Sequence, residues 1–368
     1  MATNQNLIHA RAVKKDEFYT RYEDIEAEIN AYFEYDKDVF RGKTVLCPCD
    51  DHEWSNFTKF FATNFERFGL KKLISTSYAK SAGNKQTTIA EFESPLYDRD
   101  KHDTHGKLFI LTRDTDGSGV IDQNDVEFKG YLKGDGDFRS PEVCALRDEA
   151  DVIVTNPPFS LFREFVKWIG KKRFIVMGNN NAITYKEIFP LLKDNQMWVG
   201  YTTINGGRWM ILPKDAEFIS ENAKKTDEGY ILNVPGVCWF SNIEHGKRHE
   251  TLMLDTADNL IRYNLKLIKK FAEYGVDVWP RYANYDAIEV PFVECIPSDY
   301  DGMMGVPITF MDKYNPSQFT IVGITRPWFE DKSLGIERHS SPTLVDRSGN
   351  EKSLYARLLI VKNKEKEI

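Results

Sequence analysis

The amino-acid sequence predicts an α/β fold built on a doubly wound, mostly parallel sheet. Apolar runs alternate with helical patterns before residue 80, and the same alternation resumes after residue 150. The run at residues 150–155 is rich in β-branched residues, which is typical of a buried strand. With 368 residues, the chain can bury a sizeable core and holds one large domain with a smaller domain or a long extension.

The first half of this pattern consists of two helices and two strands. Its first helix is amphipathic, because Ile25, Ile29, Tyr32 and Phe33 recur at helical spacing. A turn with the sequence Cys-Pro-Cys-Asp-Asp follows the first strand. In order, the predicted elements are a helix within residues 14–35, a strand at 43–47, a helix at 55–68 and a strand at 71–76.

The second half repeats the order of strand, helix and strand. Its third element ends in Gly178–Asn181, and such small polar residues are consistent with the rim of a pocket. Together with the first half, it brings the number of predicted strands to seven. The elements are strands at 151–155, 173–178, 197–201, 209–212 and 236–240, with helices at 160–169 and 184–193.

The last third of the chain has a different character. A helix after residue 258 carries several cationic residues and leads into an aromatic, turn-rich stretch at 279–329. A last strand is expected at 355–361. We therefore predict one domain over residues 1–257 and a second region over 258–368 that packs on it.

Composition excludes some classes of protein and leaves others open. The chain has no run of about 18 apolar residues, and its first residues lack the apolar core of a signal peptide, so we expect a cytoplasmic protein. Five scattered cysteines argue against a disulfide framework and for reduced thiols. A formal charge of −7 neither requires nor excludes a nucleic-acid partner, because phosphate binding depends on local clusters of Lys and Arg.

The most informative motif is Asn156-Pro157-Pro158-Phe159, directly after the buried strand at 151–155. Open α/β sheets bind ligands at the carboxyl ends of their strands. An amino group on an aromatic ring is a weak nucleophile, and two acceptors on its N–H bonds would free its lone pair. The Asn156 side-chain oxygen and the Pro157 carbonyl can supply them, the prolines fix the backbone, and Phe159 offers a face for stacking.

An isolated Asn-Pro pair would more simply be a turn after a strand. All four residue types in order after a buried strand favour the chemical interpretation. The motif resembles the catalytic motif of S-adenosylmethionine-dependent methyltransferases, which methylate amino groups of adenine in DNA, of some RNA bases and of protein glutamine. The motif specifies the chemistry better than the substrate.

A second motif, Asp114–Asp125, follows the spacing of a calcium-binding EF-hand loop at most ligand positions. It departs from that loop with Ser118 at the fifth position and Asp125 in place of the usual Glu. The flanking segments are predicted strands rather than helices, so a Gly- and Asp-rich hairpin turn is the alternative. We expect no metal in the function of the chain.

The segments expected on the cofactor side depart from the usual pattern. The turn after the first strand contains no glycine, and the second strand ends in Ser75-Thr76-Ser77, where an acidic residue would be expected. Asp137 and Phe138, shortly before the strand at 151–155, offer a compensation, since an Asp and an aromatic ring can contact an adenine. The alternative is a turn with solvated carboxylates.

Several blocks together resemble the adenine-specific DNA methyltransferase family typified by the EcoRI modification enzyme. The resemblance covers roughly residues 14–330. The order of the blocks is more specific than any one of them. The blocks are Asp16–Thr20, Cys47–Asp50, Gly134–Ser140, Asn156–Phe162, Gly178–Tyr185 and Gly305–Phe310.

The resemblance implies a seven-stranded methyltransferase sheet and transfer of a methyl group from S-adenosylmethionine to the N6 amino group of an adenine flipped out of duplex DNA. It implies that Asn156–Phe159 is the catalytic loop. Pro48-Cys49 is similar to the nucleophilic pair of cytosine-ring methyltransferases, but its place after the first strand favours a structural thiol. The implied cofactor residues are Phe18, Tyr19, Thr20, Cys49, Asp50, Asp137 and Phe138.

Sequence readout is expected from the last third of the chain, in a monomer. Whether a cognate restriction endonuclease shares the target sequence is left open. The expected phosphate contacts are Arg262, Lys266, Lys269 and Lys270, and the expected base contacts are Arg281, Asn284, Arg326 or Arg338. For each of them, a solvated surface residue is the alternative.

Two other functions compete with DNA methylation. A methyltransferase for an RNA base or for protein glutamine would use the same chemistry, although such enzymes usually carry a Gly-rich cofactor turn. A DNA-binding protein without activity could keep the fold, but the intact Asn156–Phe159 motif argues against it.

Overall fold

The computed structural model describes residues 18–50, 56–79, 87, 89–212, 222–227, 229–339 and 341–364. The chain forms two compact units. The first comprises Met1–Asn179 and Gly200–His245, and the second comprises Asn180–Val199 and Gly246–Ile368. Residues 180–199 and 246–257 lie in the second of these units, and the division into a domain at 1–257 and a region at 258–368 stays a prediction.

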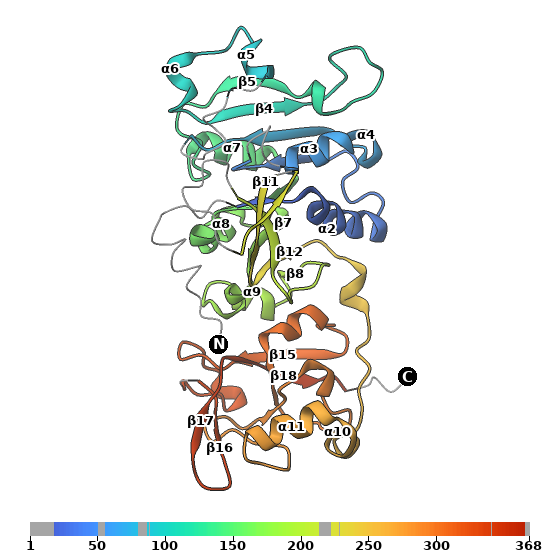
Figure 1. The fold of residues 1–368 in the computed structure, drawn as a ribbon, viewed down its shortest axis with the longest axis vertical. Coiled ribbons are helices and arrows are strands. Elements are labelled where there is room, and N and C mark those ends of the chain that lie inside the picture. Colours follow the sequence, from blue (N-terminus) through green and yellow to red (C-terminus); the bar gives the residue numbers. More distant parts are fainter. Residues whose placement is uncertain are drawn as a thin grey trace. The chain divides into compact units, whose positions relative to one another are not determined.

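The largest sheet is mixed and has the strand order β5-β4-β3-β2-β6-β7-β12-β8 (Figure 1). Its central strands β3, β2, β6 and β7 are parallel. Strands β4 and β5 continue the sheet antiparallel at one side, and β12 pairs antiparallel with β7. The strands are β2 (Thr44–Cys47), β3 (Lys72–Thr76), β4 (Lys107–Leu111), β5 (Glu127–Tyr131), β6 (Val152–Thr155), β7 (Arg173–Asn179), β8 (Trp198–Val199) and β12 (Val237–Ser241).

The α/β class and the parallel centre of the sheet agree with the prediction. The predicted seven mostly parallel strands are confirmed only in part, because the sheet has eight strands and is mixed. The segment expected at 209–212 forms β9 (Arg208–Ile211) in a separate sheet. The connection between β4 and β5 contains only a turn and the short helix η2 (Gln123–Asp125). Without a crossover helix it reverses the chain, so this edge is antiparallel.

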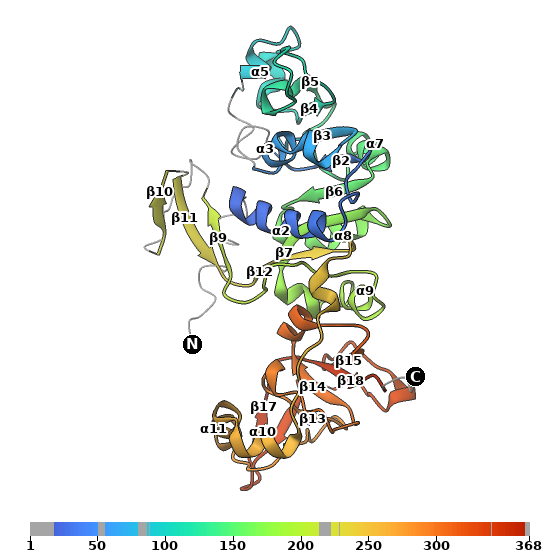
Figure 2. The same cartoon turned by 90° about the vertical axis from the view of Figure 1, so that its right-hand side faces the viewer.

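Helices cover both faces of the parallel strands (Figure 2). Helices α2 and α3 lie on one face, where phenylalanines such as Phe57 and Phe61 pack with Val45 and Val152 in a buried core. Helices α7 and α8 lie on the other face. The helices of the first unit are α2 (Tyr22–Tyr35), α3 (Asn56–Thr63), α4 (Phe65–Phe68), α5 (Ile89–Phe92), α6 (Arg99–His102), α7 (Pro141–Glu149), η3 (Phe159–Leu161) and α8 (Phe162–Ile169).

A small antiparallel sheet with the order β1-β9-β11-β10 belongs to the first unit. It joins the beginning of the described chain to residues after 200, because β1 (Tyr19–Thr20) pairs with β9 through Thr20 and Met210. Strands β10 (Lys224–Thr226) and β11 (Gly229–Val234) complete it. One face enters the core, since Met210 and Val234 are both buried there.

The second unit holds a sheet with the order β13-β14-β18-β15, and its last strand agrees with the prediction at 355–361. The strands of this sheet are β13 (Ile288–Glu289), β14 (Met304–Pro307), β15 (Phe319–Ile324) and β18 (Arg357–Lys362). Strands β16 (Thr343–Val345) and β17 (Glu351–Ser353) form a separate two-stranded sheet. The helices of the second unit are η4 (Asn180–Thr184), α9 (Phe189–Lys193), η5 (Gly246–His249), α10 (Ala257–Tyr263), α11 (Leu265–Glu273), η6 (Val293–Cys295), η7 (Ile308–Lys313) and η8 (Lys332–Leu334).

A buried ion pair links strands of the four-stranded sheet in the second unit. Arg357 on β18 donates to the carboxylate of Glu289 on β13, at 2.8 Å from Nη2 and 3.0 Å from Nε. Tyr274 and Tyr282 also donate to this carboxylate, which has no exposed surface. Four donors on one buried carboxylate offset the cost of removing it from water.

Candidate active site

The Asn-Pro-Pro-Phe loop leaves the carboxyl end of β6, between the parallel neighbours β2 and β7. Four buried residues form this strand, as the sequence predicted. Its last residue, Thr155, is 1% exposed and donates its hydroxyl hydrogen to the carbonyl of Pro48, in the turn after β2. The loop therefore starts from two adjacent strands that are tied together at their carboxyl ends.

Within the residues that the structure describes, the Asn156 side chain has one hydrogen-bond partner and one unused acceptor. Its Nδ2 donates to the backbone carbonyl of Phe18 at 2.7 Å. Its Oδ1 is buried and accepts a hydrogen bond from none of the residues that the structure describes. Because the amide nitrogen is held by a carbonyl, the oxygen is fixed on the opposite side of the amide. A buried acceptor without a donor is uncommon in native proteins and calls for an explanation.

The rest of the loop is rigid and partly apolar. Pro157 is buried, and the Pro158 carbonyl accepts the Leu161 N–H at 2.9 Å, at the start of η3. Phe159 is half-buried and packs against the core of the first unit. Two successive prolines and this short helix fix the backbone on both sides of the Phe159 ring.

The turn after β2 takes a strained conformation in place of the missing glycine. Cys49 has φ of 60°, in the left-handed region that glycine normally occupies. The next residue, Asp50, is 2% exposed. Its carboxylate accepts the Thr58 N–H at 3.1 Å and the Thr58 hydroxyl at 2.5 Å, and its carbonyl accepts the Ser75 hydroxyl at 2.9 Å. Asp50 therefore links the ends of β2 and β3 to the first turn of α3.

Replacement of Cys49 tests both its backbone conformation and the structural interpretation of its thiol. Relief of the left-handed strain is worth about 1–2 kcal/mol and the added freedom of the unfolded chain costs about 0.5–1 kcal/mol, so Cys49→Gly should be slightly stabilising. Cys49→Val should be destabilised, because a β-branched residue tolerates positive φ poorly. Thermal melts and methyl-transfer assays of both variants check this. Loss of activity in a well-folded Cys49→Gly protein would assign the thiol a chemical role.

The Gly134–Phe138 segment packs closely against the end of β3. The Ala79 N–H donates to the Asp135 carbonyl at 2.7 Å, and the Gly106 N–H donates to the Gly134 carbonyl at 3.0 Å. Gly136 has φ of 84°, and a Cβ atom there would lie 2.1 Å from the Ser77 carbonyl oxygen. The segment can therefore approach the sheet only with glycine at this position.

Asp137 and Phe138 have partners within the protein. The Asp137 carboxylate accepts from Arg139 at 2.9 Å from Nε and 2.6 Å from Nη2. Phe138 is 2% exposed and packs edge-to-face against Phe165 and Trp168 of α8. The structure thus gives Phe138 a packing role, while Asp137 keeps a side chain that is 25% exposed. Contact of either residue with the cofactor stays a prediction.

The structure brings together residues that are far apart in the sequence. The segment Phe18–Thr20 lies at the Asn156 loop, and Asn56 donates to the Thr20 carbonyl at 2.8 Å. Thr76, at the end of β3, has a buried hydroxyl that finds no hydrogen-bond partner in the described part of the chain. Sequence patterns did not single out Asn56 or the Thr76 hydroxyl, because neither belongs to a recognisable motif. Asp16 and Glu17 lie outside the residues that the structure describes.

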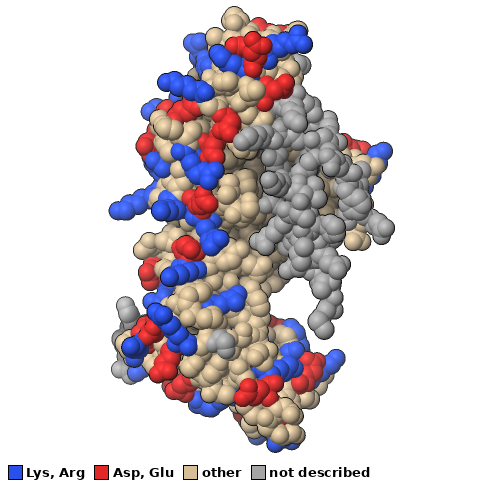
Figure 3. Space-filling model, turned by 90° about the vertical axis from the view of Figure 1, so that its left-hand side faces the viewer, with Lys and Arg blue, Asp and Glu red and all other residues tan. Residues whose placement is uncertain are grey.

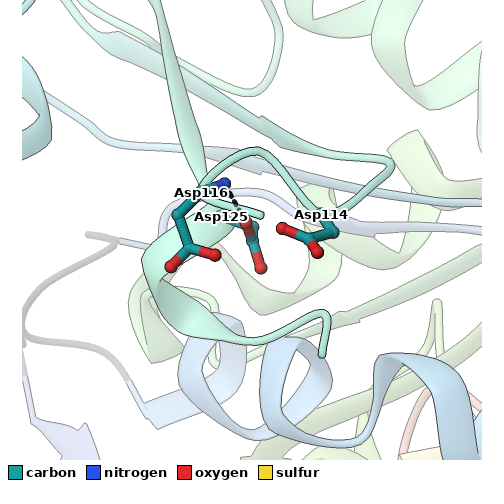
Figure 4. Close-up of side chains that lie close together, drawn as sticks. All are labelled: Asp114, Asp116 and Asp125. Atoms are coloured by element: carbon teal, nitrogen blue, oxygen red, sulfur yellow. Dashed lines mark hydrogen bonds between the residues drawn. The ribbon is translucent and has the colours of Figure 1, made fainter. Parts of the chain in front are cut away.

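The Asp114–Asp125 loop has the hydrogen bonds of a polar turn, and Figure 4 shows the one from the Asp116 N–H to Asp125. Oxygen atoms of Asp114, Asp116 and Asp125 lie within 4.8 Å of one another. However, Asp114 accepts the N–H groups of Gly117 and Gly119, both at 2.7 Å, and these donors lower its pKa. Asp125 accepts the N–H groups of Thr115 and Asp116, at 2.6 and 3.3 Å. These contacts fit the hairpin-turn alternative.

Many of the cationic residues expected to contact DNA pair with carboxylates of the second unit. Arg262 pairs with Asp258, Lys266 with Glu294, Lys270 with Glu273, Arg281 with Asp286 and Arg338 with Glu330. In the part of the surface described in Figure 3, Lys and Arg alternate with Asp and Glu. In the protein without DNA, the charges of these residues are therefore partly neutralised by their carboxylate partners.

Two other candidate base contacts are held by neighbouring groups. Asn284 donates to the Ser341 carbonyl at 3.0 Å and accepts the Thr343 N–H at 3.0 Å, so both ends of its amide fix a loop. Arg326 donates to the Thr184 hydroxyl at 3.0 Å and lies over the ring of Tyr355. Base readout by these residues stays a prediction.

The α/β sheet and its strand-end Asn-Pro-Pro-Phe loop are characteristic of methyltransferases that act on amino groups. A model of the family described as "Adenine-specific methyltransferase EcoRI" matches residues 6–364. The type II methyltransferase M.EcoRI of Escherichia coli is 37% identical over 367 residues, which cover 99% of this chain and 98% of that protein. The chain therefore belongs to the EcoRI family and is an adenine-specific DNA methyltransferase of type II.

Two further relatives cover most of the chain. The type II methyltransferase M.MpnI of Mycoplasma pneumoniae is 34% identical over 322 residues, which cover 85% of this chain and 83% of that protein. The type II methyltransferase M.MgeORF184P of Mycoplasma genitalium is 32% identical over 364 residues, covering 96% and 97% respectively. No solved structure matches the chain. Among the described residues, no helix is long and apolar enough to span a bilayer.

Proposed function

We propose that the chain transfers a methyl group from S-adenosylmethionine to the N6 atom of an adenine flipped out of duplex DNA, and that the loop Asn156–Phe159 carries the chemistry. The observation that supports this proposal is the buried, unpaired Oδ1 of Asn156, fixed by the hydrogen bond from Nδ2 to Phe18. An acceptor that is held in place and has no internal donor suits an N–H group of the substrate.

The mechanism follows from two acceptors and a flat ring. Asn156 Oδ1 accepts one N–H of the adenine amino group and the Pro157 carbonyl accepts the other. Both acceptors draw the amino hydrogens out of the ring plane and so return the lone pair to the nitrogen. The two hydrogen bonds strengthen as positive charge develops on that nitrogen. Phe159 stacks on the base. No general base is needed, because the methylated amine is cationic and loses its proton readily.

Residues at the carboxyl ends of β2 and β3 fit a polar cofactor. The Thr76 hydroxyl is buried there without a partner among the described residues, and such a group is usually satisfied by a ligand or a water. When bound, S-adenosylmethionine supplies an electrophilic methyl group on a sulfonium. We assign its binding to the segment Phe18–Thr20, the turn Cys49–Asp50 and Asp137. The Asp50 carboxylate already accepts a hydrogen bond from Thr58, so Asp50 contributes to cofactor binding by shaping the turn after β2. Phe138 is buried and supports the segment that presents Asp137.

A methyl-transfer assay tests the proposal. The purified protein is incubated with methyl-labelled S-adenosylmethionine and unmethylated duplex DNA, and the nucleosides are analysed by mass spectrometry. We expect N6-methyladenine at one short sequence, which the modified sites identify. Label in RNA or protein but not in DNA would move the substrate to an RNA base or to glutamine, and no transfer to any of the three would contradict the proposed chemistry.

A further inference from the structure

The segment that holds the catalytic amide is itself held by a second asparagine. Asn56 is the first residue of α3 and is 8% exposed. Its Nδ2 donates to the Thr20 carbonyl at 2.8 Å. Thr20 is the last residue of β1, which is only two residues long. Two pairs of residues with β9 are too few to fix a strand firmly, so the side-chain hydrogen bond adds a needed anchor.

The same short strand is anchored from a second direction. The Thr20 hydroxyl, which is 2% exposed, donates to Met177 Sδ on β7 at 3.0 Å. Strand β1 is thus held both by α3 and by a central strand of the main sheet. Two residues before Thr20, the Phe18 carbonyl accepts the Asn156 Nδ2 at 2.7 Å. A shift of β1 therefore moves the group that orients the Asn156 amide.

The orientation of this amide decides what it can do chemically. The two ends of an asparagine amide have nearly the same shape, and only hydrogen bonds distinguish oxygen from nitrogen. If the Phe18 carbonyl moves away, the amide can turn over and present its NH₂ group where an acceptor is required. Two N–H groups would then face each other, and the substrate amine would lose its activation. Correct placement of reacting groups within about 1 Å commonly changes rates by on the order of a hundredfold.

We propose that Asn56 is a positioning residue for Asn156, acting through the backbone of Phe18–Thr20. This inference rests on the proposed role of Asn156 in methyl transfer. It assigns to the Phe18–Thr20 segment a task in addition to cofactor binding, which is to keep the acceptor of the catalytic asparagine turned toward the substrate. Asn56 itself touches neither substrate nor cofactor in this scheme.

Asn56→Asp is the most direct test. The substitution keeps the shape of the side chain and removes the N–H donor, and an acidic residue in the first turn of a helix is compatible with the helix dipole. At saturating S-adenosylmethionine, we expect the single-turnover methylation rate to fall on the order of tenfold. The dissociation constant for DNA should stay within about twofold, and that for S-adenosylmethionine should rise by a smaller factor than the rate falls. Asn56→Ala should give a similar change in rate.

Asn64→Ala is a matched control on the same helical segment. Asn64 also donates its side-chain amide to a carbonyl, that of Phe60 at 2.9 Å, but it does not contact β1 in the hydrogen bonds observed. We expect a comparable loss in melting temperature and a methylation rate within about twofold of that of the wild type. A rate loss in Asn64→Ala equal to that in Asn56→Ala would reduce the effect to general helix stability and overturn the inference.

The outcomes separate the inference from the function on which it rests. If the wild type transfers no methyl group, or Asn156→Ala remains fully active, the proposed function fails first. If the wild type is active and Asn156→Ala is not, a wild-type rate in Asn56→Asp overturns the positioning role alone. A rate loss in Asn56→Asp matched by an equal loss of cofactor affinity also overturns it. A rate loss at saturating cofactor that exceeds any loss of cofactor affinity, together with an unaffected Asn64→Ala protein, supports it.

Discussion

Asn156→Ala is expected to lower the methylation rate by about a hundredfold to a thousandfold, which is the usual cost of removing one preorganised group from a transition state. The adenine amino group keeps the Pro157 carbonyl as an acceptor but loses Oδ1, so its nitrogen is less able to attack. Cofactor affinity should stay close to that of the wild type, because Asn156 is assigned to the base rather than to the sulfonium. Single-turnover rates and calorimetric titration with the cofactor measure the two quantities.

A matched control separates this loss from a folding defect. Asn179 ends the neighbouring strand β7, and its side chain donates to the Pro235 carbonyl at 3.3 Å. Asn179→Ala therefore removes a comparable amide-to-carbonyl hydrogen bond near the same edge of the sheet and should keep most of the rate. Equal loss of rate and of cofactor affinity in Asn156→Ala would instead assign Asn156 to the integrity of the fold.

The parallel centre of the sheet could be predicted from the sequence because burial on both faces leaves a local mark. Strands β2, β3, β6 and β7 lie close to the predicted segments, and the loop after β6 stands at the expected edge. Continuous apolar residues are required wherever helices cover a strand on both sides. The motif and its place in the fold were therefore both readable from local patterns.

The edges of the sheet could not be predicted in the same way. Strand β9 has an apolar pattern like that of a strand in the main sheet, yet it pairs with β1, as in the pair Tyr19 and Ile211, which lie 192 residues apart in the chain (211 − 19). Local residue types determine that a segment is extended, whereas the choice of neighbour depends on packing across the whole domain.

The least predictable features of the site are single contacts. Cys49 occupies a left-handed conformation that the sequence gives no reason to expect. From the sequence, the absence of glycine indicated only that the turn after the first strand is atypical. Asp50 was expected at the cofactor, but its carboxylate caps the first turn of α3 through Thr58. Residues of one type can serve a ligand or the fold, and only their partners in space distinguish the two roles.

Gly136→Ala is expected to destabilise the first unit by about 3 kcal/mol or more. Positive φ costs an L-residue about 1–2 kcal/mol, and overpacking adds about 1–3 kcal/mol. The added Cβ would lie 2.1 Å from the Ser77 carbonyl oxygen and 3.1 Å from Gly106 Cα. Both neighbours are backbone atoms at the end of β3 and the start of β4, so the clash is relieved only if the Gly134–Phe138 segment moves away from the sheet.

Gly117→Ala isolates the clash from the backbone strain. Gly117 has φ of 74°, close to that of Gly136, but a Cβ atom there meets nothing within 4 Å. The melting temperature of Gly117→Ala should therefore fall only by the amount that the backbone strain causes. The melting temperature of Gly136→Ala should fall several degrees further. Because the displaced segment carries Asp137, Gly136→Ala should also weaken binding of S-adenosylmethionine, and Gly117→Ala should not. Equal melting temperatures and equal cofactor affinities in the two variants would show that the Gly134–Phe138 segment is not held against β3 in solution, and the proposed cofactor contact of Asp137 would lose its structural basis.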